Sequence, residues 1–199
     1  AVGREWRMMV VPDSAKDPSA LLRRLTNEAE PLANRLSSAA LLCAALPTAV
    51  GRAFADASTD ELLGTLEWLL YGERVPPALQ AHARALVAAA GAALRSHPSR
   101  FIRWAVGVDG RAASAVYPAL LDLLGTARAS EWAGELEPRL VSTLDRLLRW
   151  ALDPARSPAQ ASRQLASALR SIPPQLWRAA GSFGPQALLS LAVEMQGEA

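Results

Sequence analysis

The sequence predicts an all-α fold, and three observations support this prediction. Strong helix formers dominate, because the 199 residues include 41 Ala and 32 Leu. Residues that favour strands are scarce, with 11 Val, 2 Ile and 6 Thr. Apolar residues recur at helical spacing between Pro and Gly positions that begin and end helices. We therefore expect about ten helices in antiparallel pairs, joined by short connections.

The first helices are marked by prolines. Asp17 followed by Pro18 pairs an N-cap acid with a first-turn proline and predicts a helix start. Residues 1–16 precede this start as an N-terminal extension, which we expect to be mobile. Pro31 ends or kinks the first helix, and a second helix follows up to Pro47.

The next helix has a marked start and a marked end. Ser58 and Glu61 fit a capping box, in which each side chain accepts a hydrogen bond from the backbone N–H of the other residue. Gly72 is the expected stop. The apolar stripe between them consists of Leu62, Leu63, Leu66, Leu69 and Leu70.

Prolines and glycines also divide the rest of the chain. Pro76 and Pro77 begin a long Ala-rich helix that we expect to reach Ser96, and Pro98 begins a short one. Later helices are expected at 112–124, 137–151, 158–171, 174–180 and 185–195.

Several segments of the chain recur in the same order, which is typical of helical-repeat proteins. The matched segments are 62–70 with 140–148, 93–105 with 168–180, and 119–123 with 187–191. A chain this rich in Leu and Ala also matches itself by chance, which is the alternative explanation. The repeat interpretation defines two similar four-helix units, at 59–125 and 137–195, after a capping unit at 17–55.

These units would form a single helical-repeat domain over residues 17–199. A unit that cannot bury its apolar face alone stacks on its neighbour, so the predicted architecture is a right-handed, HEAT-like α-solenoid. A short signature, Pro-x-x-apolar-x-Arg, occurs three times, as Pro47/Val50/Arg52, Pro98/Phe101/Arg103 and Pro173/Leu176/Arg178. We expect its apolar residue to point inward and its arginine to reach the surface over a buried stem.

The chain lacks the sequence motifs of common catalytic and cofactor sites, including nucleophile elbows, phosphate-binding loops and zinc-protease helices. The single cysteine, Cys43, excludes an internal disulfide, and with only His82 and His97 beside it no structural zinc set is available. We interpret Cys43 and His82 as structural residues and His97 as an exposed one. The sequence therefore predicts no enzyme activity, cofactor, metal or small-molecule substrate.

The length of the apolar segments and the charge of the chain limit which partners and compartments we expect. The longest apolar run, residues 39–46, is far shorter than the ~20 residues of a membrane span. We expect a soluble intracellular protein of the cytoplasm, nucleus or an organellar matrix. The net charge is +2, which is a weak argument for a polyanionic partner of the whole chain. Residues 137–180, however, carry seven arginines against three acids.

Arginine and tryptophan supply the candidate partner-binding residues. They are adjacent in four places, at Trp6-Arg7, Arg103-Trp104, Arg149-Trp150 and Trp177-Arg178. The full set of candidates is Trp68, Arg103, Trp104, Arg149, Trp150, Arg163, Arg170, Trp177 and Arg178. Such residues anchor protein interfaces, and they also track phosphates and stack bases in single-stranded RNA.

Each of these residues also has a structural interpretation. An arginine run can be a solvated helix face, and a tryptophan can pack between helices. Trp68 lies opposite the leucine stripe of its helix, so it either packs on the preceding unit or marks a partner site.

Two segments resemble known helical-repeat families. Ser182 to Ala192, and more loosely Ser58 to Gly72 followed by Pro76 and Pro77, resemble the helix pairs of octotricopeptide and related organellar RNA-binding repeats. The general pattern is similar to HEAT-like repeats, including the helical C-terminal regions of Fanconi anaemia core subunits. The resemblance implies a non-catalytic scaffold and carries over no base-reading positions.

The expected function is therefore that of a non-catalytic scaffold or adaptor, which binds other protein subunits in a larger complex. The alternative is RNA binding by the Arg-rich C-terminal unit in an organellar ribonucleoprotein. Strong salt dependence of binding would identify RNA, because each neutralised phosphate releases counterions.

Overall fold

The computed structural model describes residues 17–126, 140–151, 161, 163–165 and 170. Every regular element in these residues is a helix, which confirms the all-α prediction. The α-helices are α1 (Pro18–Thr26), α2 (Leu32–Ala45), α3 (Ala49–Ala57), α4 (Thr59–Tyr71), α5 (Pro77–Ala93), α6 (Pro98–Gly107), α7 (Ala113–Thr126) and α9 (Leu140–Ala151). Short 3-10 helices, η2 (Leu94–Ser96) and η3 (Gly110–Ala112), flank α6.

Several predicted segments lie outside the described residues. These are the extension at 1–16 and the helices at 174–180 and 185–195. The expected helix at 158–171 is seen at residues 161, 163–165 and 170, all of which are helical. The second predicted unit, 137–195, is thus described mainly through α9.

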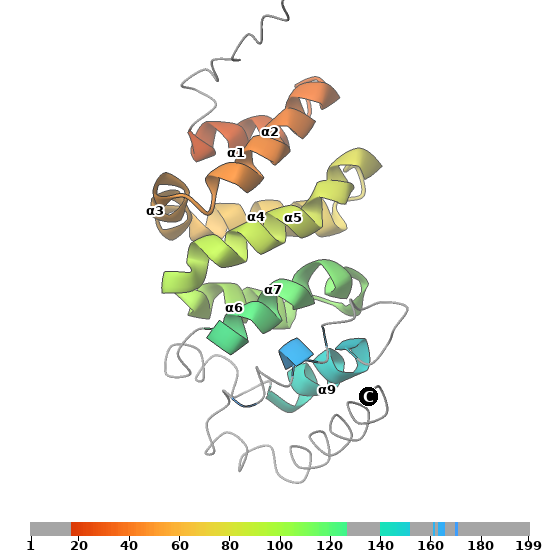
Figure 1. Ribbon diagram of the computed structural model, residues 1–199. Helices are drawn as coiled ribbons and strands as arrows, with labels where there is room; N and C mark the ends of the chain where they lie inside the picture. The colour runs from red at the N-terminus through yellow and green to blue at the C-terminus, as the bar shows by residue number, and fades with distance from the viewer. Residues whose placement is uncertain (1–16, 127–139, 152–160, 162, 166–169, 171–199) are drawn as a thin grey trace, which may run out of the picture.

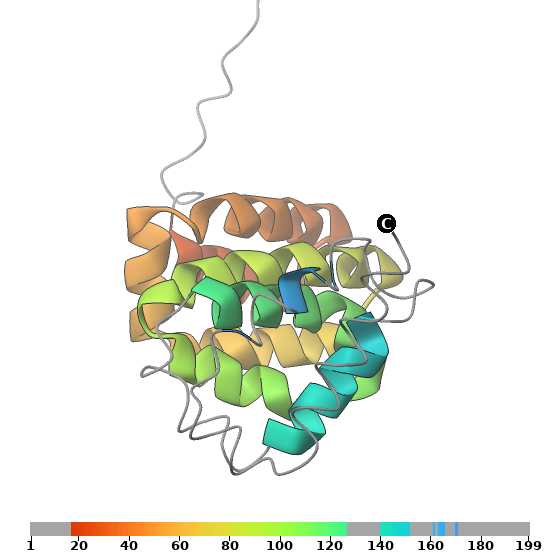
Figure 2. The same cartoon turned by 60° about the horizontal axis from the view of Figure 1, so that its bottom comes forward.

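The helices lie in successive layers that follow the order of the chain (Figure 1). α1 packs on α2, α4 on α5 and α6 on α7. α5 is the central helix, because it also packs on α2 in the preceding layer and on α7 in the next. α9 contacts α7 and runs obliquely to it in the second view (Figure 2).

The described helices share one continuous hydrophobic core. Each layer contributes fully buried side chains, of which Leu25, Leu66, Leu86 and Phe101 are examples from α1, α4, α5 and α6. Full burial of such a side chain stabilises the fold by about 1.5–3 kcal/mol. Alanines and Gly91 on α5 allow its neighbours to approach, and the Phe101 ring lies 3.5 Å from where a Cβ of Gly91 would be.

The start of α1 matches the prediction. The Asp17 carboxylate accepts a hydrogen bond from the Ser19 backbone N–H at 3.0 Å, and Pro18 is the first helical residue. α1 ends at Thr26, before Pro31, because the Asn27 side chain accepts the Ala29 N–H at 3.0 Å and forms a local turn. Pro31 is instead the N-cap of α2.

The predicted capping box does not form. Ser58 is the N-cap of α4, but its side chain accepts no capping hydrogen bond. Its backbone N–H donates to the Phe54 carbonyl at 2.8 Å and completes α3, so it is not available to Glu61. Ser58 alone separates the two helices, and this short junction replaces the capping box.

The proline signature is right for α6 and wrong for α3. Phe101 is fully buried, as expected, whereas Val50 is 63% exposed. α3 buries Gly51 and Ala55 instead, so its inward face begins one residue later than the signature predicts. Arg52 is exposed, and its guanidinium donates to the Pro47 carbonyl at 2.8 Å.

In the described ranges, no single helix has both the length and the apolar composition of a membrane span. α2 and α3 reach that composition only when taken together, and the two helices meet at a bend of 103°.

Candidate functional site

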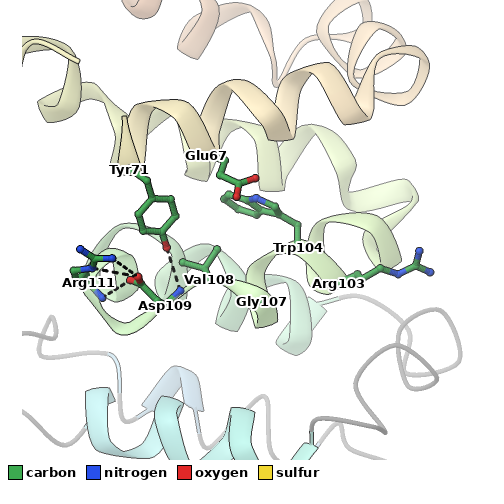
Figure 3. Close-up of a pocket in the computed structure, with 8 residues that line it drawn as sticks. All are labelled: Glu67, Tyr71, Arg103, Trp104, Gly107, Val108, Asp109 and Arg111. Carbon is green, nitrogen blue, oxygen red and sulfur yellow. Dashed lines mark hydrogen bonds and ion pairs between the residues drawn. The ribbon is translucent and has the colours of Figure 1, made fainter. Parts of the chain in front are cut away.

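An open cleft of about 520 Å³ lies where α4 meets the end of α6 and the loop that leads to α7 (Figure 3). The lining residues are Glu67 and Tyr71 of α4, Arg103, Trp104 and Gly107 of α6, and Val108, Asp109 and Arg111 of the loop. The cleft therefore joins two successive layers of the fold. Of the residues singled out from the sequence, Arg103 and Trp104 lie here.

Tyr71 and Arg111 hold the loop side of the cleft in place. The Tyr71 hydroxyl accepts a hydrogen bond from the Asp109 backbone N–H at 3.1 Å. The Asp109 carboxylate accepts the backbone N–H of Arg111 at 2.8 Å, and the Arg111 guanidinium donates to the same carboxylate through Nε and Nη2. The hydrogen bond from the Arg111 backbone is the main cause that lowers the pKa of Asp109, so this group is ionised at neutral pH.

Trp104 and Glu67 form the other side. Trp104 is half-buried, and its ring packs on the Phe101 ring with centroids 5.4 Å apart and planes tilted by 58°. Glu67 is exposed one layer above and lines the same cleft as Trp104 (Figure 3). Arg103 also lines the cleft, and its guanidinium points away from Trp104 in the same view. The cleft thus combines an aromatic face with a carboxylate.

Arg146 of α9 contacts the C-terminal end of α6, next to the cleft. Its guanidinium donates to the Val106 carbonyl at 2.7 Å and to the Val108 carbonyl at 3.1 Å. Carbonyls at a helix C-terminus lack partners within the helix and carry partial negative charge, so a guanidinium is well suited to them. α9 therefore supports the loop that shapes the cleft.

Trp68 packs on the preceding layer, which was one of its two predicted roles. The Arg35 guanidinium of α2 lies over its ring, 5.5 Å from the centroid. Arg35 is 5% exposed, and its Nε donates to the Leu25 carbonyl at the end of α1 at 3.0 Å. This pair connects α1, α2 and α4.

The second candidate pair, Arg149 and Trp150, separates in space. Trp150 is 4% exposed, and its ring meets the Tyr117 ring edge-on at 5.6 Å. Arg149 is exposed. Consecutive residues on a helix point in different directions, so adjacency in the sequence does not bring their side chains together.

The remaining candidates fall in the C-terminal part. Arg163 and Arg170 are both exposed. Trp177 and Arg178 lie outside the described residues, as does the Trp6-Arg7 pair. The structure thus brings Arg103 and Trp104 to the cleft and does not bring Trp68 or Trp150 there.

The residues considered for catalysis or metal binding are dispersed. Cys43 is half-buried, and burial raises the pKa of its thiol, which makes the reactive thiolate scarcer at neutral pH. The His82 ring Nδ1 lies 3.1 Å from the Ala78 carbonyl of its own helix, and His97 is exposed. Within the described ranges, no three His, Cys, Asp or Glu side chains gather as metal ligands.

Sequence reasoning missed most of the cleft. Of its lining residues it singled out Arg103 and Trp104, but neither Tyr71 nor Asp109. The one available signal was the position of Tyr71 directly before the helix-ending Gly72. The hydrogen bond between Tyr71 and Asp109 joins residues 38 positions apart, and it forms only because α4 packs on α6.

No protein-family model, curated protein or solved structure matches the chain. The octotricopeptide-like and HEAT-like resemblances therefore stay predictions, and the functional argument rests on the residues and their geometry.

Proposed function

We propose that this chain is a non-catalytic scaffold or adaptor that binds other protein subunits of a larger complex. The observation that most supports this proposal is the open cleft. Tyr71 and Trp104 line it together with charged side chains, at the junction of two layers. Tryptophan, tyrosine and arginine are the residue types that contribute most to binding in protein interfaces.

The layered packing supports the finer architecture that we propose, a right-handed HEAT-like solenoid of antiparallel helix pairs. α1 with α2, α4 with α5, and α6 with α7 form successive layers in chain order. A solenoid built in this way has an extended surface on which several partners can bind.

RNA is the second candidate partner, and one observation favours it. Arg163 and Arg170 are exposed, as a phosphate-binding stripe requires. Arg146, from the same Arg-rich run, instead donates to backbone carbonyls of the protein itself. Part of the positive charge behind the RNA hypothesis therefore has a structural role, and we favour a protein partner.

A pull-down of the tagged chain from its native extract tests the proposal. One half of the extract is treated with nuclease, and bound protein and RNA are identified in both. We expect the same set of proteins in the two halves. Loss of the bound proteins together with the RNA would overturn the scaffold proposal and favour RNA binding.

Matched variants locate the binding surface. We expect Trp104→Ala to lower retention of the protein set several-fold while the far-ultraviolet circular dichroism stays unchanged, because Trp104 is half-buried at the cleft. Arg84→Ala, an exposed change on α5 that does not line this cleft, is the control. Equal retention by both variants would exclude the cleft as the binding surface.

The RNA alternative has its own variant. Arg163→Glu combined with Arg170→Glu reverses two exposed charges. If the alternative is right, this double variant loses retention on single-stranded RNA, and the wild-type chain binds less tightly as salt increases. Undiminished retention would exclude this arginine stripe.

A further inference from the structure

We propose that the cleft lined by Glu67, Tyr71 and Trp104 receives an arginine side chain of a partner protein, whose backbone lies along the exposed face of α4. This inference rests on the proposed function and adds the chemistry of the partner.

The charges of the cleft favour a cation over an anion. Arg111 and Asp109 neutralise each other through their ion pair at 3.1 Å, and the guanidinium of Arg103, which also lines the cleft, points away from Trp104 and Tyr71 (Figure 3). Among the described residues, the Glu67 carboxylate takes part in no hydrogen bond or ion pair. The cleft therefore holds one carboxylate that no described side chain neutralises.

The aromatic wall suits a guanidinium. The Trp104 ring packs on Phe101, which is fully buried, and it lines the cleft together with Glu67. A planar guanidinium can stack on an indole and donate to a carboxylate at the same time, which an ammonium does less well. The chain already contains the stacking of a guanidinium on an indole one layer away, where the Arg35 guanidinium lies over Trp68 at 5.5 Å.

Tyr71 forms a fixed wall of the cleft. Its oxygen accepts the Asp109 N–H at 3.1 Å, and its hydroxyl also interacts with the Asp109 side chain. Burial raises the pKa of Tyr71, and the phenol is protonated at neutral pH. The Tyr71 ring is therefore held in place on the side of the cleft that faces the loop.

Gly64 gives the partner's backbone room along α4. Gly64, Glu67 and Tyr71 follow at intervals of three and four residues and so share one face of the helix. Apart from its chain neighbours and the backbone of its own helix, no described atom lies within 4 Å of where a Cβ of Gly64 would be, so packing of the described residues does not require glycine here. A glycine in a helix interior destabilises the helix relative to alanine, and close approach of a partner would explain it.

A titration with a small probe tests the recognition of arginine. The indole N–H signal of Trp104 is followed by nuclear magnetic resonance in the full chain, and Trp104→Phe assigns it. N-acetyl-arginine amide is the probe, and N-acetyl-citrulline amide, which has the same shape without the charge, is its control. We expect a saturable shift with the arginine amide at millimolar concentration and none with the citrulline amide.

Glu67→Gln should weaken binding of the arginine amide about fivefold, while Glu61→Gln, an exposed change on the same helix outside the cleft, should leave it unchanged. Equal shifts with the two amides, tighter binding of N-acetyl-lysine amide, or an unaffected Glu67→Gln variant would each overturn the inference.

Gly64→Ala tests the position of the partner's backbone. We expect it to raise the melting temperature of the free chain by about 2–4 °C. The same change should lower retention of the protein set in the pull-down several-fold. Unchanged or increased retention would contradict a partner that lies along α4.

The two proposals fail in different ways. If the nuclease-resistant proteins are retained but the arginine amide does not bind, the inference about the cleft is wrong and the scaffold proposal stands. If the amide binds but no protein set survives nuclease, the scaffold proposal is wrong while the cleft still recognises a guanidinium.

Discussion

Arg35 and Arg146 place their guanidinium groups at the C-terminal ends of helices in the fold. Arg35 donates to the last turn of α1 through the Leu25 carbonyl, and Arg146 donates to the Val106 and Val108 carbonyls at the end of α6. Both side chains thus satisfy carbonyls that the helices leave unpaired. The arginine excess, which in the sequence indicated RNA, therefore includes residues that stabilise the protein.

The contact between Arg35 and Trp68 gives the first prediction. Trp68→Ala should lower the free energy of unfolding by about 2 kcal/mol, because it removes the ring over a guanidinium that is 5% exposed. A double-mutant cycle with Arg35→Met, measured by urea unfolding, should show a coupling energy of about 1 kcal/mol. Additive effects would mean that the ring and the guanidinium do not stabilise each other.

The sequence predicted single residues well where their environment was local. The Asp17 cap and the exposed His97 at the start of α6 are examples, and both depend on neighbours in the chain. The partner of Trp68 could not be predicted in this way, since Arg35 is 33 positions away and reaches it through packing of helices. The same holds for Trp150, which the structure buries against Tyr117.

At the scale of elements, α6 depends on α9. Arg146→Met should lower the free energy of unfolding by about 2 kcal/mol, because two carbonyls lose a charged donor. Urea unfolding measures this change, and hydrogen exchange should show faster exchange in the loop that carries Asp109. Arg84→Met, at an exposed site of α5, should change the stability by less than about 0.5 kcal/mol. Equal effects of the two variants would contradict the role of Arg146.

The junction of α2 and α3 depends on Gly51. A Cβ at this position would collide with the Ala45 carbonyl oxygen and would lie 2.5 Å from the Leu46 Cα. Both are backbone atoms, which cannot move aside as a side-chain end can. Gly51→Ala should therefore lower the free energy of unfolding by about 3 kcal/mol in a urea titration. A variant as stable as the wild type would show that the two helices are further apart.

Helix boundaries were largely predictable because prolines and glycines act locally. The expected starts at Pro77 and Pro98 are the observed first residues of α5 and α6. The inward register of α3 was not predictable, since it depends on how close the backbone of Gly51 comes to α2. The prediction of the capping box was wrong because α3 runs directly into α4, and the Ser58 N–H completes α3.

At the scale of the whole molecule, the hydrophobic core buries or partly buries three groups that lose protons at high pH. Burial raises the pKa of Tyr71 and of Tyr117, for which the nearby Arg146 partly opposes the shift. Burial also raises the pKa of Cys43. These two tyrosines are all that the chain contains.

The sign of the pH effect follows from these shifts. A group with a raised pKa holds its proton in the folded state after the unfolded chain has lost it, so its contribution is complete below the unfolded pKa and is lost above it. The free energy of unfolding should thus fall as the pH rises above the ordinary values of 9.0 for cysteine and 10.0 for tyrosine. Urea unfolding at several pH values from 8 to 11 measures this fall in the free energy of unfolding.

Variants separate the two kinds of group in this pH effect. Tyr71→Phe combined with Tyr117→Phe should flatten the decline above pH 10, and Cys43→Ala should remove the part that begins near pH 9. A decline of the same size in all three proteins would show that other groups cause it.

The fold class was predictable at this scale and the site was not. Composition and periodicity led to an all-α fold, because both report on local helix formation. The cleft brings together α4, α6 and the loop after α6, and its shape depends on the angles at which layers pack. Trp104 was singled out as an anchor from its residue type, but its neighbours Glu67 and Tyr71 were found only in three dimensions.

Gly51 and Gly64 should leave different records in evolution. Any descendant of this fold that keeps the corner between α2 and α3 must keep glycine at position 51, since the backbone itself leaves no room for a Cβ. Position 64 has room for one, so nothing in the described part of the chain opposes a change to alanine there. If diverged lineages retain glycine at position 64, the constraint would come from a binding partner that evolved together with this protein.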